Sequence, residues 1–143
     1  NYPQDPNESN SFYSFAKKYL PTDKFNILDS QTKDPAKECA GYEAKIIAAG
    51  GLDLAVLGIG SNGHIAYNEP GTSFDSLTHL VKLQNQKFEY GLTMGIKTII
   101  SAKKIILLAK GAAKAASILQ QHLDATFILD REAAGLLKKN AIL

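Results

Sequence analysis

The chain has 143 residues, of which 45% are hydrophobic and 21% charged, which is enough to form one globular domain with a buried core. Its net charge of +2 comes from interspersed basic and acidic residues, so the sequence offers no basic stripe for nucleic acid. Its single cysteine, Cys39, cannot form an internal disulfide, and no apolar run approaches the ~20 residues of a membrane span. No signal peptide starts the chain. We therefore expect a cytoplasmic protein that does not enter membranes.

Helical and strand patterns alternate along the chain. The first helix is indicated by Phe12, Phe15 and Tyr19, which follow a group of cap candidates at residues 9–11. In chain order, the predicted elements are a helix through Phe12–Tyr19, a strand at 24–28, a helix from Pro35 with Asp34 as N-cap to the Gly50-Gly51 pair, strands at 52–57 and 79–83, a helix around 93–101, a strand at 104–109, a helix from about 112, a strand at 125–129 and a helix at 131–138.

This alternation predicts an α/β fold with a mainly parallel sheet flanked by helices. The predicted strands are short apolar runs, as expected of strands buried on both faces. We find no internal repeat and no low-complexity segment. The sequence therefore predicts a single α/β domain over residues 1–143.

The segment Gly58-Ile-Gly-Ser-Asn-Gly-His-Ile-Ala-Tyr-Asn-Glu-Pro-Gly71 directly follows the strand predicted at 52–57. In open α/β sheets, ligands bind outside the carboxyl ends of the strands. The glycines allow the backbone to approach a ligand closely, His64 can exchange a proton near neutral pH, and Glu69 lies in the same loop. The segment therefore predicts a small-molecule site with acid/base chemistry.

Two other interpretations of this loop explain its residues less well. Gly58, Gly60 and Gly63 match the glycine spacing of a dinucleotide fold, but the turn at residues 70–71 allows no helix to begin after the last glycine, and no acidic residue stands about 20 residues later. The second alternative is purely structural, with a turn at Asn62-Gly63 and a buried histidine. The combination of glycines, imidazole and carboxylate favours the site.

The same fourteen residues closely resemble the signature of the glucosamine-6-phosphate deaminase (isomerase) family, the sister group of the 6-phosphogluconolactonases. Lactonases resemble the first half of the segment but lack the Asn68-Glu69-Pro70 part. The resemblance covers most of the chain and implies a modified Rossmann-like three-layer sandwich. Further matches lie at Thr78–Leu83, Leu92–Gly95, Ile105–Lys114 and Ile118–His122.

The resemblance implies ketose-forming deamination of glucosamine 6-phosphate to fructose 6-phosphate, by a deaminase-like hydrolase and isomerase that needs no metal and no redox cofactor. It implies that His64 moves a proton between the C1 hydroxyl and the ring oxygen, and that Glu69 orients His64. Asn62 stands where the family commonly has Asp; an amide can hydrogen-bond His64 but cannot carry a proton as a carboxylate can. The expected substrate-binding residues are Gly58, Gly60, Ser61 and Gly63 of the glycine turn and Lys114, which matches the lysine that binds the sugar phosphate.

Several alternatives stay open. Asn62 leaves the galactosamine epimer possible as substrate, a lactonase remains the enzyme rival, and a non-catalytic sugar-phosphate sensor or a homo-oligomer fits the same resemblance. The family's phosphate loop and its Asp-Glu-Tyr segment, whose Asp acts on the substrate carbon, do not occur here. Measured against the family, the chain corresponds to the larger C-terminal part of the domain, with segments missing before Asn1, after Leu83 and near Lys114. We expect a chain limited to these residues to be inactive.

Overall fold

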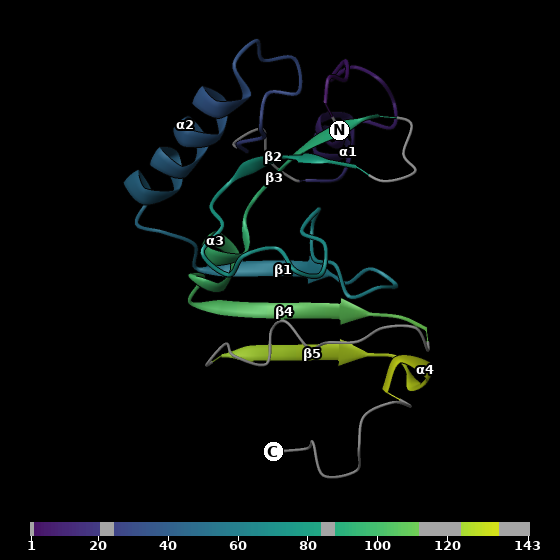
Figure 1. Ribbon diagram of the computed structural model, residues 1–143. Helices are drawn as coiled ribbons and strands as arrows, with labels where there is room; N and C mark the ends of the chain where they lie inside the picture. The colour runs from purple at the N-terminus through teal and green to yellow at the C-terminus, as the bar shows by residue number, and fades with distance from the viewer. Residues whose placement is uncertain (1, 21–24, 84–87, 112–123, 135–143) are drawn as a thin grey trace.

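The computed structural model describes residues 2–20, 25–83, 88–111 and 124–134. A parallel sheet with strand order β1-β4-β5 and a separate antiparallel pair β2-β3 form its framework (Figure 1). This confirms the predicted α/β fold with a mainly parallel sheet and flanking helices. The elements are α1 (Phe12–Tyr19), α2 (Pro35–Ala48), β1 (Leu54–Gly58), β2 (His79–Lys82), β3 (Tyr90–Thr93), α3 (Ile96–Ile100), β4 (Lys104–Ala109), β5 (Ala125–Leu129) and α4 (Arg131–Ala134).

Strand β4 is the centre of the parallel sheet and of the core. It pairs with β1 in the register Val56↔Ile106 and with β5 in the register Leu107↔Phe127. Ile105 and Leu107 are fully buried, as expected of apolar side chains in a central strand. The strands β4 and β5 have the bounds that the sequence predicts, because short apolar runs between turn residues identify buried strands well.

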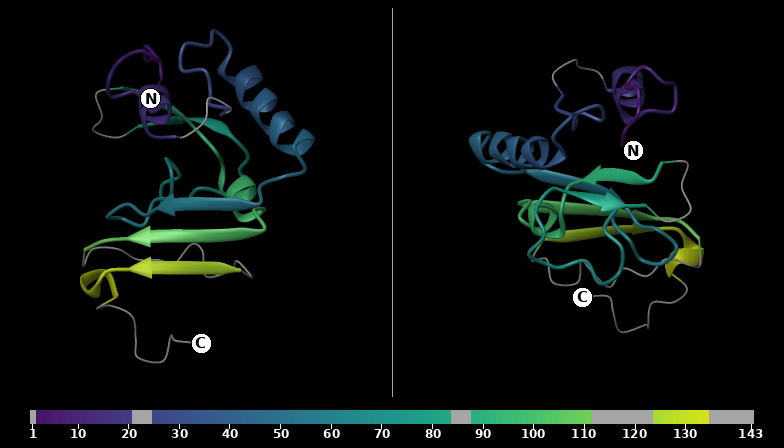
Figure 2. Two further views of the ribbon diagram at one scale, coloured as in Figure 1. Left: turned by 180° about the vertical axis from the view of Figure 1, so that it is seen from behind. Right: turned by 45° about the horizontal axis from the view of Figure 1, so that its top comes forward.

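The carboxyl ends of β1, β4 and β5 lie at one edge of the sheet (Figures 1 and 2). The glycine loop begins there after β1, and α4 follows β5 at the same edge. Helix α3 lies at the opposite edge, where β4 begins. The topology therefore places the candidate site where parallel sheets bind ligands.

Helix α2 begins and ends as predicted. The Asp34 side chain accepts a hydrogen bond from Lys37 N at 3.0 Å, and Pro35 occupies the first turn. Gly50 and Gly51 end the helix with φ values of 87° and 92°, which favour glycine.

Helix α1 forms with Ser11 as its N-cap, but its aromatic residues do not face the core. Phe12, Phe15 and Tyr19 are each more than half exposed, and the buried residue of the helix is Ala16. Helical spacing of apolar residues therefore identifies the helix, whereas the burial of that stripe depends on tertiary contacts.

One predicted strand does not form, and two predicted elements have other bounds than expected. Residues 25–28 form no strand. The apolar side chains there pack against other side chains and do not belong to a paired strand; the rings of Phe25 and Tyr13, for example, are in edge contact with their centroids 5.8 Å apart. The helix expected around residues 93–101 is only Ile96–Ile100, since Thr93 ends the unpredicted strand β3, where it pairs with His79. The strand expected at 52–57 begins at Leu54 and includes Gly58.

Some expectations fall outside the described residues. These are the helix from about 112, the end of the helix at 131–138, and the junctions after Leu83 and near Lys114, which stay predictions. Within the described part of the chain, no helix is long and apolar enough to cross a membrane.

Glu43 joins α2 to the segments that follow the glycine loop. Its carboxylate accepts hydrogen bonds from Thr78 N at 2.7 Å, from the Thr78 hydroxyl at 2.5 Å and from the Thr98 hydroxyl at 2.7 Å. Burial raises the pKa of Glu43, but these hydrogen bonds together outweigh it, so the pKa lies below its ordinary value. The ionised form therefore stabilises the fold.

We expect Glu43→Gln to lower the free energy of unfolding by about 1 to 2 kcal/mol at pH 7, because charge-assisted hydrogen bonds become neutral ones. A lowered folded pKa stabilises the protein above the ordinary glutamate pKa of 4.5, and this contribution is lost as the pH falls through the folded value. The difference between the wild type and the variant should therefore shrink below pH 4.5. Urea titrations at several pH values measure it, with Glu89→Gln as the control, because the Glu89 carboxylate is exposed and 3.8 Å from Lys82 Nζ. A difference independent of pH would contradict the prediction.

Candidate active site

The glycine loop folds back on itself directly after β1. Gly60 N donates to the His64 carbonyl at 2.8 Å, and Gly63 N donates to the Gly60 carbonyl at 3.2 Å. Gly63 has a φ of 91°, in the left-handed region that favours glycine. This tight turn returns His64 to the start of the loop. No helix forms in residues 64–75, which confirms the prediction that no helix begins after Gly63 and argues against a dinucleotide fold.

The His64 imidazole lies directly against Gly60. A Cβ atom at Gly60 would come within 3.0 Å of three atoms of the His64 ring, Cε1, Nδ1 and Nε2. Real Cβ atoms do not make such contacts, so the ring occupies space that only a glycine leaves open. Gly60 is therefore needed for the placement of the imidazole.

His64, Asn62 and Glu69 form one hydrogen-bonded group. The Asn62 side-chain oxygen lies 2.8 Å from His64 Nδ1 and accepts from His64 N at 3.1 Å. The Asn62 side-chain nitrogen donates to Glu69 Oε2 at 2.5 Å, and Glu69 Oε1 lies 3.6 Å from His64 Nδ1. The three residues predicted as catalytic, His64, Glu69 and Asn62, are thus in contact, with Asn62 between the other two.

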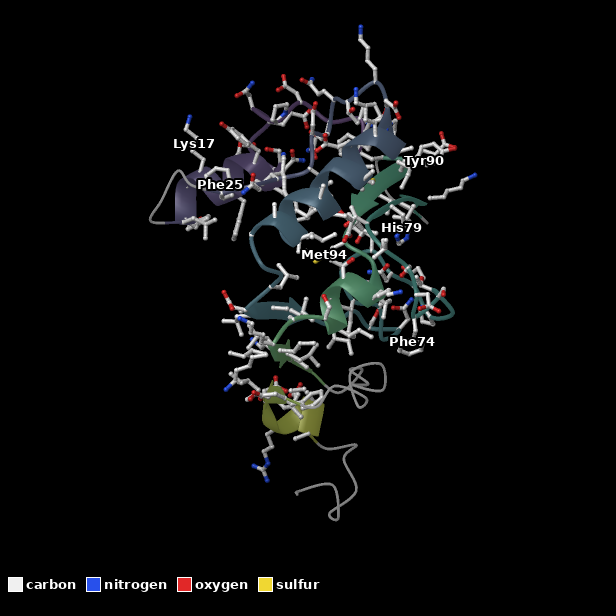
Figure 3. All side chains as sticks on the ribbon, turned by 90° about the vertical axis from the view of Figure 1, so that its left-hand side faces the viewer. Lys17, Phe25, Phe74, His79, Tyr90 and Met94 are labelled. Atoms are coloured by element: carbon white, nitrogen blue, oxygen red, sulfur yellow. The ribbon has the colours of Figure 1, made fainter. Side chains whose placement is uncertain are left out.

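This group is open to solvent and to a ligand. The side chains of His64 and Glu69 are 36% and 43% exposed. Asn62 and Glu69 line a cavity of about 400 Å³, whereas His64 does not line it. Phe74 on the wall of this cavity lies at the outer side of the molecule (Figure 3). An exposed imidazole beside a carboxylate can accept and return protons of a bound molecule.

Asn68 fastens the second half of the loop to the rest of the protein. The residue is fully buried, and its side-chain nitrogen donates to the Ile65 carbonyl at 3.1 Å and to the Met94 carbonyl at 2.8 Å. Ile65 and Asn68 also close a two-residue turn whose first residue, Ala66, has a φ of 53°. The sequence does not predict this role, because Met94 is 26 residues away from Asn68.

We expect Asn68→Ala to lower the free energy of unfolding by about 2 kcal/mol, because two carbonyl groups lose a buried donor. Chemical denaturation of the variant beside the wild type measures the effect. Asn26→Ala is the matched control, since Asn26 is exposed. Equal stability of the two variants would show that Asn68 does not fasten the loop.

The other predicted binding residues differ in their exposure to solvent. Gly58 and Ser61 are exposed at the edge of the sheet, Gly63 is buried, and Lys114 lies outside the described residues. In the described ranges, no three His, Cys, Asp or Glu side chains gather closely enough to hold a metal ion.

Asp130 fixes the exit of β4 at the same edge. Its carboxylate accepts from Gly111 N at 3.0 Å and from Ala133 N at 2.8 Å, at the start of α4. Hydrogen bonds from these backbone groups, Ala133 first, lower the pKa of Asp130. The carboxylate thus ties the backbone at Gly111 to the start of α4.

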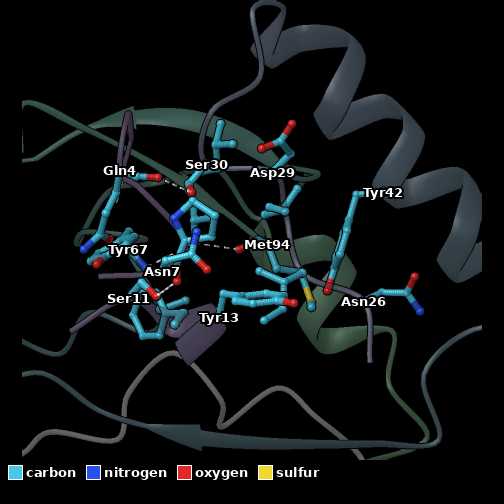
Figure 4. A pocket seen from close by; sticks show the side chains of 17 residues that line it. Gln4, Asn7, Ser11, Tyr13, Asn26, Asp29, Ser30, Tyr42, Tyr67 and Met94 are labelled. Carbon is cyan, nitrogen blue, oxygen red and sulfur yellow. Dashed lines mark hydrogen bonds between the residues drawn. The ribbon is translucent and has the colours of Figure 1, made fainter. Parts of the chain in front are cut away.

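A larger cavity of about 780 Å³ lies behind the loop. Tyr13 of α1, Tyr42 of α2 and Met94 lie around it (Figure 4), and Ala66 and Tyr67 of the loop contribute to its wall. Burial raises the pKa of both Tyr42 and Tyr67. His64, Asn62 and Glu69 do not line this cavity, so it is separate from the group that they form.

Residues 3–130 match the family described as glucosamine-6-phosphate isomerases/6-phosphogluconolactonase. A protein of Clostridium acetobutylicum named glucosamine-6-phosphate deaminase is 42% identical over an alignment of 158 residues, which includes 90% of this chain. The chain spans 65% of the length of that relative.

Solved structures agree with this family. A structure described as a monomeric glucosamine-6-phosphate deaminase superposes with a TM-score of 0.86 at 35% identity, over 95% of this chain and 71% of its own. A 6-phosphogluconolactonase from Trypanosoma brucei has a TM-score of 0.60 at 20% identity, over 82% of this chain and 58% of its own, which shows a shared fold alone.

Proposed function

Because the chain belongs to the family of glucosamine-6-phosphate isomerases and 6-phosphogluconolactonases, we propose that it deaminates glucosamine 6-phosphate to fructose 6-phosphate with release of ammonia. The observation that carries the proposal is the group formed by His64, Asn62 and Glu69 at the carboxyl edge of the parallel sheet. We further propose that the protein acts in the cytoplasm, a compartment that suits its unpaired Cys39.

In this proposal His64 opens the pyranose ring. It accepts the proton of the C1 hydroxyl and delivers a proton to the ring oxygen, so the C1–O bond of the ring breaks and an aldehyde forms. Glu69, with its carboxylate oxygen 3.6 Å from Nδ1, stabilises the imidazolium that exists between the two transfers. His64 is exposed enough to reach a bound sugar while keeping its contacts to the loop.

The substrate phosphate needs a cation, and Lys114 is proposed to bind it, with the backbone of Gly58, Gly60, Ser61 and Gly63 lining the sugar. The Asp130 carboxylate accepts hydrogen bonds from Gly111 N, which lies three residues before Lys114 in the sequence. The group that removes the C2 proton is not assigned to any residue of this chain.

Two further functions have specific support. A 6-phosphogluconolactonase is named in the description of the matched family, but the relatives named deaminases match at higher identity than the lactonase structure. Deamination of the galactosamine epimer is favoured by Asn62, which replaces the Asp common at this position. We rank both below glucosamine 6-phosphate deamination.

Ammonia release by the intact protein tests the proposal. Purified protein is incubated with glucosamine 6-phosphate in EDTA, and ammonia and fructose 6-phosphate are quantified. We expect both products in equal amounts at a rate that EDTA does not change, since His64 and Glu69 supply the acid/base chemistry. Parallel reactions use galactosamine 6-phosphate and 6-phosphogluconolactone. Hydrolysis of the lactone with no turnover of either amino sugar would overturn the proposal, and binding of the sugars without turnover would indicate a sensor.

A further inference from the structure

The cavity of about 780 Å³ lies between α1, α2 and the second half of the loop (Figure 4). Its volume is within the range of about 300 to 1,000 Å³ that is typical of sites for small organic molecules. The rings of Tyr13, Tyr42 and Tyr67 and the thioether of Met94 belong to its wall. Because aromatic faces pack well against other flat rings, these walls favour a ligand with a planar ring system.

The charges around this cavity do not suit the sugar phosphate that is proposed as the substrate. Among the described residues that line the cavity, no side chain is basic, and the one ionised side chain is that of Asp29. Asp29 is exposed, and its carboxylate accepts a hydrogen bond from Gln31 N at 2.9 Å. A phosphate group needs charge-assisted hydrogen bonds, which these walls do not offer, and burial of an unpaired charge is costly. The cavity therefore suits an uncharged ligand.

Two tyrosine hydroxyls offer polar contacts to such a ligand. The hydroxyls of Tyr13 and Tyr42 make no hydrogen bond to any described residue, although both side chains line the cavity. In Figure 4 both side chains point toward Met94. Burial raises the pKa of Tyr42, which keeps its hydroxyl protonated. A neutral phenol can both donate and accept a hydrogen bond, so it can bind a hydroxyl or carbonyl group of a ligand.

The wall of the cavity on the side of the loop contains residues that hold the loop in place. Tyr67 N donates to the Thr93 hydroxyl at 3.2 Å, and the Met94 carbonyl accepts from the Asn68 side chain at 2.8 Å. Tyr67, Thr93 and Met94 all line the cavity. Glu69 follows two residues after Tyr67 in the chain. We propose that the cavity binds an uncharged planar ring compound with a hydroxyl or carbonyl group, and that this ligand contacts the loop through Tyr67 and Met94.

Fluorescence titration of the purified protein with 2-naphthol tests the binding in the absence of any sugar phosphate. This probe is a flat, uncharged ring compound with one hydroxyl, and its fluorescence can be followed because the chain contains no tryptophan. We expect saturable binding of one molecule per chain. 2-Naphthyl phosphate has the same rings and a negative charge, and its affinity should be lower by about tenfold or more, because an unpaired charge is costly to bury. Equal binding of the two probes, or no saturable binding of 2-naphthol, would overturn the proposal.

Removal of the two hydroxyls tests where the probe binds. In the double variant Tyr13→Phe/Tyr42→Phe the rings remain, and the dissociation constant for 2-naphthol should rise about fivefold or more, which corresponds to the loss of one hydrogen bond. Tyr19→Phe is the matched control, because Tyr19 lies on the same helix as Tyr13, is 59% exposed and does not line the cavity. The affinity of this control should equal that of the wild type. Unchanged affinity in the double variant would show that the probe binds elsewhere, and the proposal would be wrong.

Backbone NMR spectra of labelled protein test the contact between the ligand and the loop. On addition of 2-naphthol, the amide signals of Tyr67, Asn68 and Met94 should shift. The signals of β5 should stay in place, since no residue of β5 lines the cavity. Shifts in β5 without shifts at Tyr67 and Met94 would contradict the proposed site.

Sedimentation of the protein with and without the probe distinguishes a small ligand from a second copy of the chain as the occupant. We expect the same sedimentation in both cases. If part of a second copy fills the cavity, 2-naphthol should dissociate a dimer, and this result would overturn the proposal. Because every measurement is made without substrate, a failure of the proposed deamination would leave these outcomes unchanged.

Discussion

Replacing His64 with alanine is expected to lower kcat by roughly 10² to 10⁴-fold, the usual contribution of a general acid/base group. The ring has the geometry for this role, because Nδ1 lies 2.8 Å from the Asn62 oxygen and the side chain is 36% exposed. KM should change little, since His64 acts in proton transfer and the phosphate supplies most of the charged binding contacts. Initial-rate kinetics on glucosamine 6-phosphate measure both constants.

Lys114→Ala is the contrasting variant, because loss of the lysine that we propose binds the phosphate should mainly raise KM. His79→Ala is the matched control for removal of an imidazole; His79 Nδ1 lies 2.8 Å from the Leu77 carbonyl in the strand segment beyond the loop. We expect this control to retain the wild-type kcat. A pure KM effect in His64→Ala would mean that His64 only binds, and the proposed ring opening would be wrong.

The contacts among Asn62, His64 and Glu69 were predictable from the sequence because these residues are close together in the chain. Asn62, His64 and Glu69 lie within one loop, and the glycine turn that returns His64 toward Gly60 is itself a local feature. The carboxyl edge of the sheet was equally predictable, since alternating strands and helices bring the exits of parallel strands together.

The supports of this loop were not predictable, because their partners are distant in sequence. Asn68 donates to a carbonyl 26 residues away, and Glu43 accepts from hydroxyls 35 and 55 residues away. Strand β3 was missed for the same reason: Tyr90–Thr93 becomes a strand by pairing with β2, and a four-residue segment contains too little pattern to show it. Periodicity reports local geometry, whereas burial and pairing depend on the whole fold.

The steric role of Gly60 also escaped prediction, and it leads to a sharp expectation. A Cβ atom at this position would come within 3.0 Å of the His64 ring, so Gly60→Ala must displace the imidazole from its place beside Asn62. A displacement of about 1 Å at a reacting group can lower the rate about 10²-fold, and we expect a loss of kcat of at least this size. The free energy of unfolding should change much less, because His64 is partly exposed and can rotate outward.

Gly41→Ala is the matched control for Gly60→Ala, since it makes the same substitution in helix α2, outside the site. A Cβ atom at Gly41 would meet no atom within 4 Å, so this variant should keep the wild-type kcat. Kinetics and thermal denaturation of both variants separate a displaced ring from an unfolded loop. If Gly60→Ala retains full activity, the imidazole does not work from its position against Gly60, and the productive orientation of His64 must differ from the one described. If both variants lose activity equally, the loss does not arise from contact with the imidazole, and the steric role assigned to Gly60 is wrong.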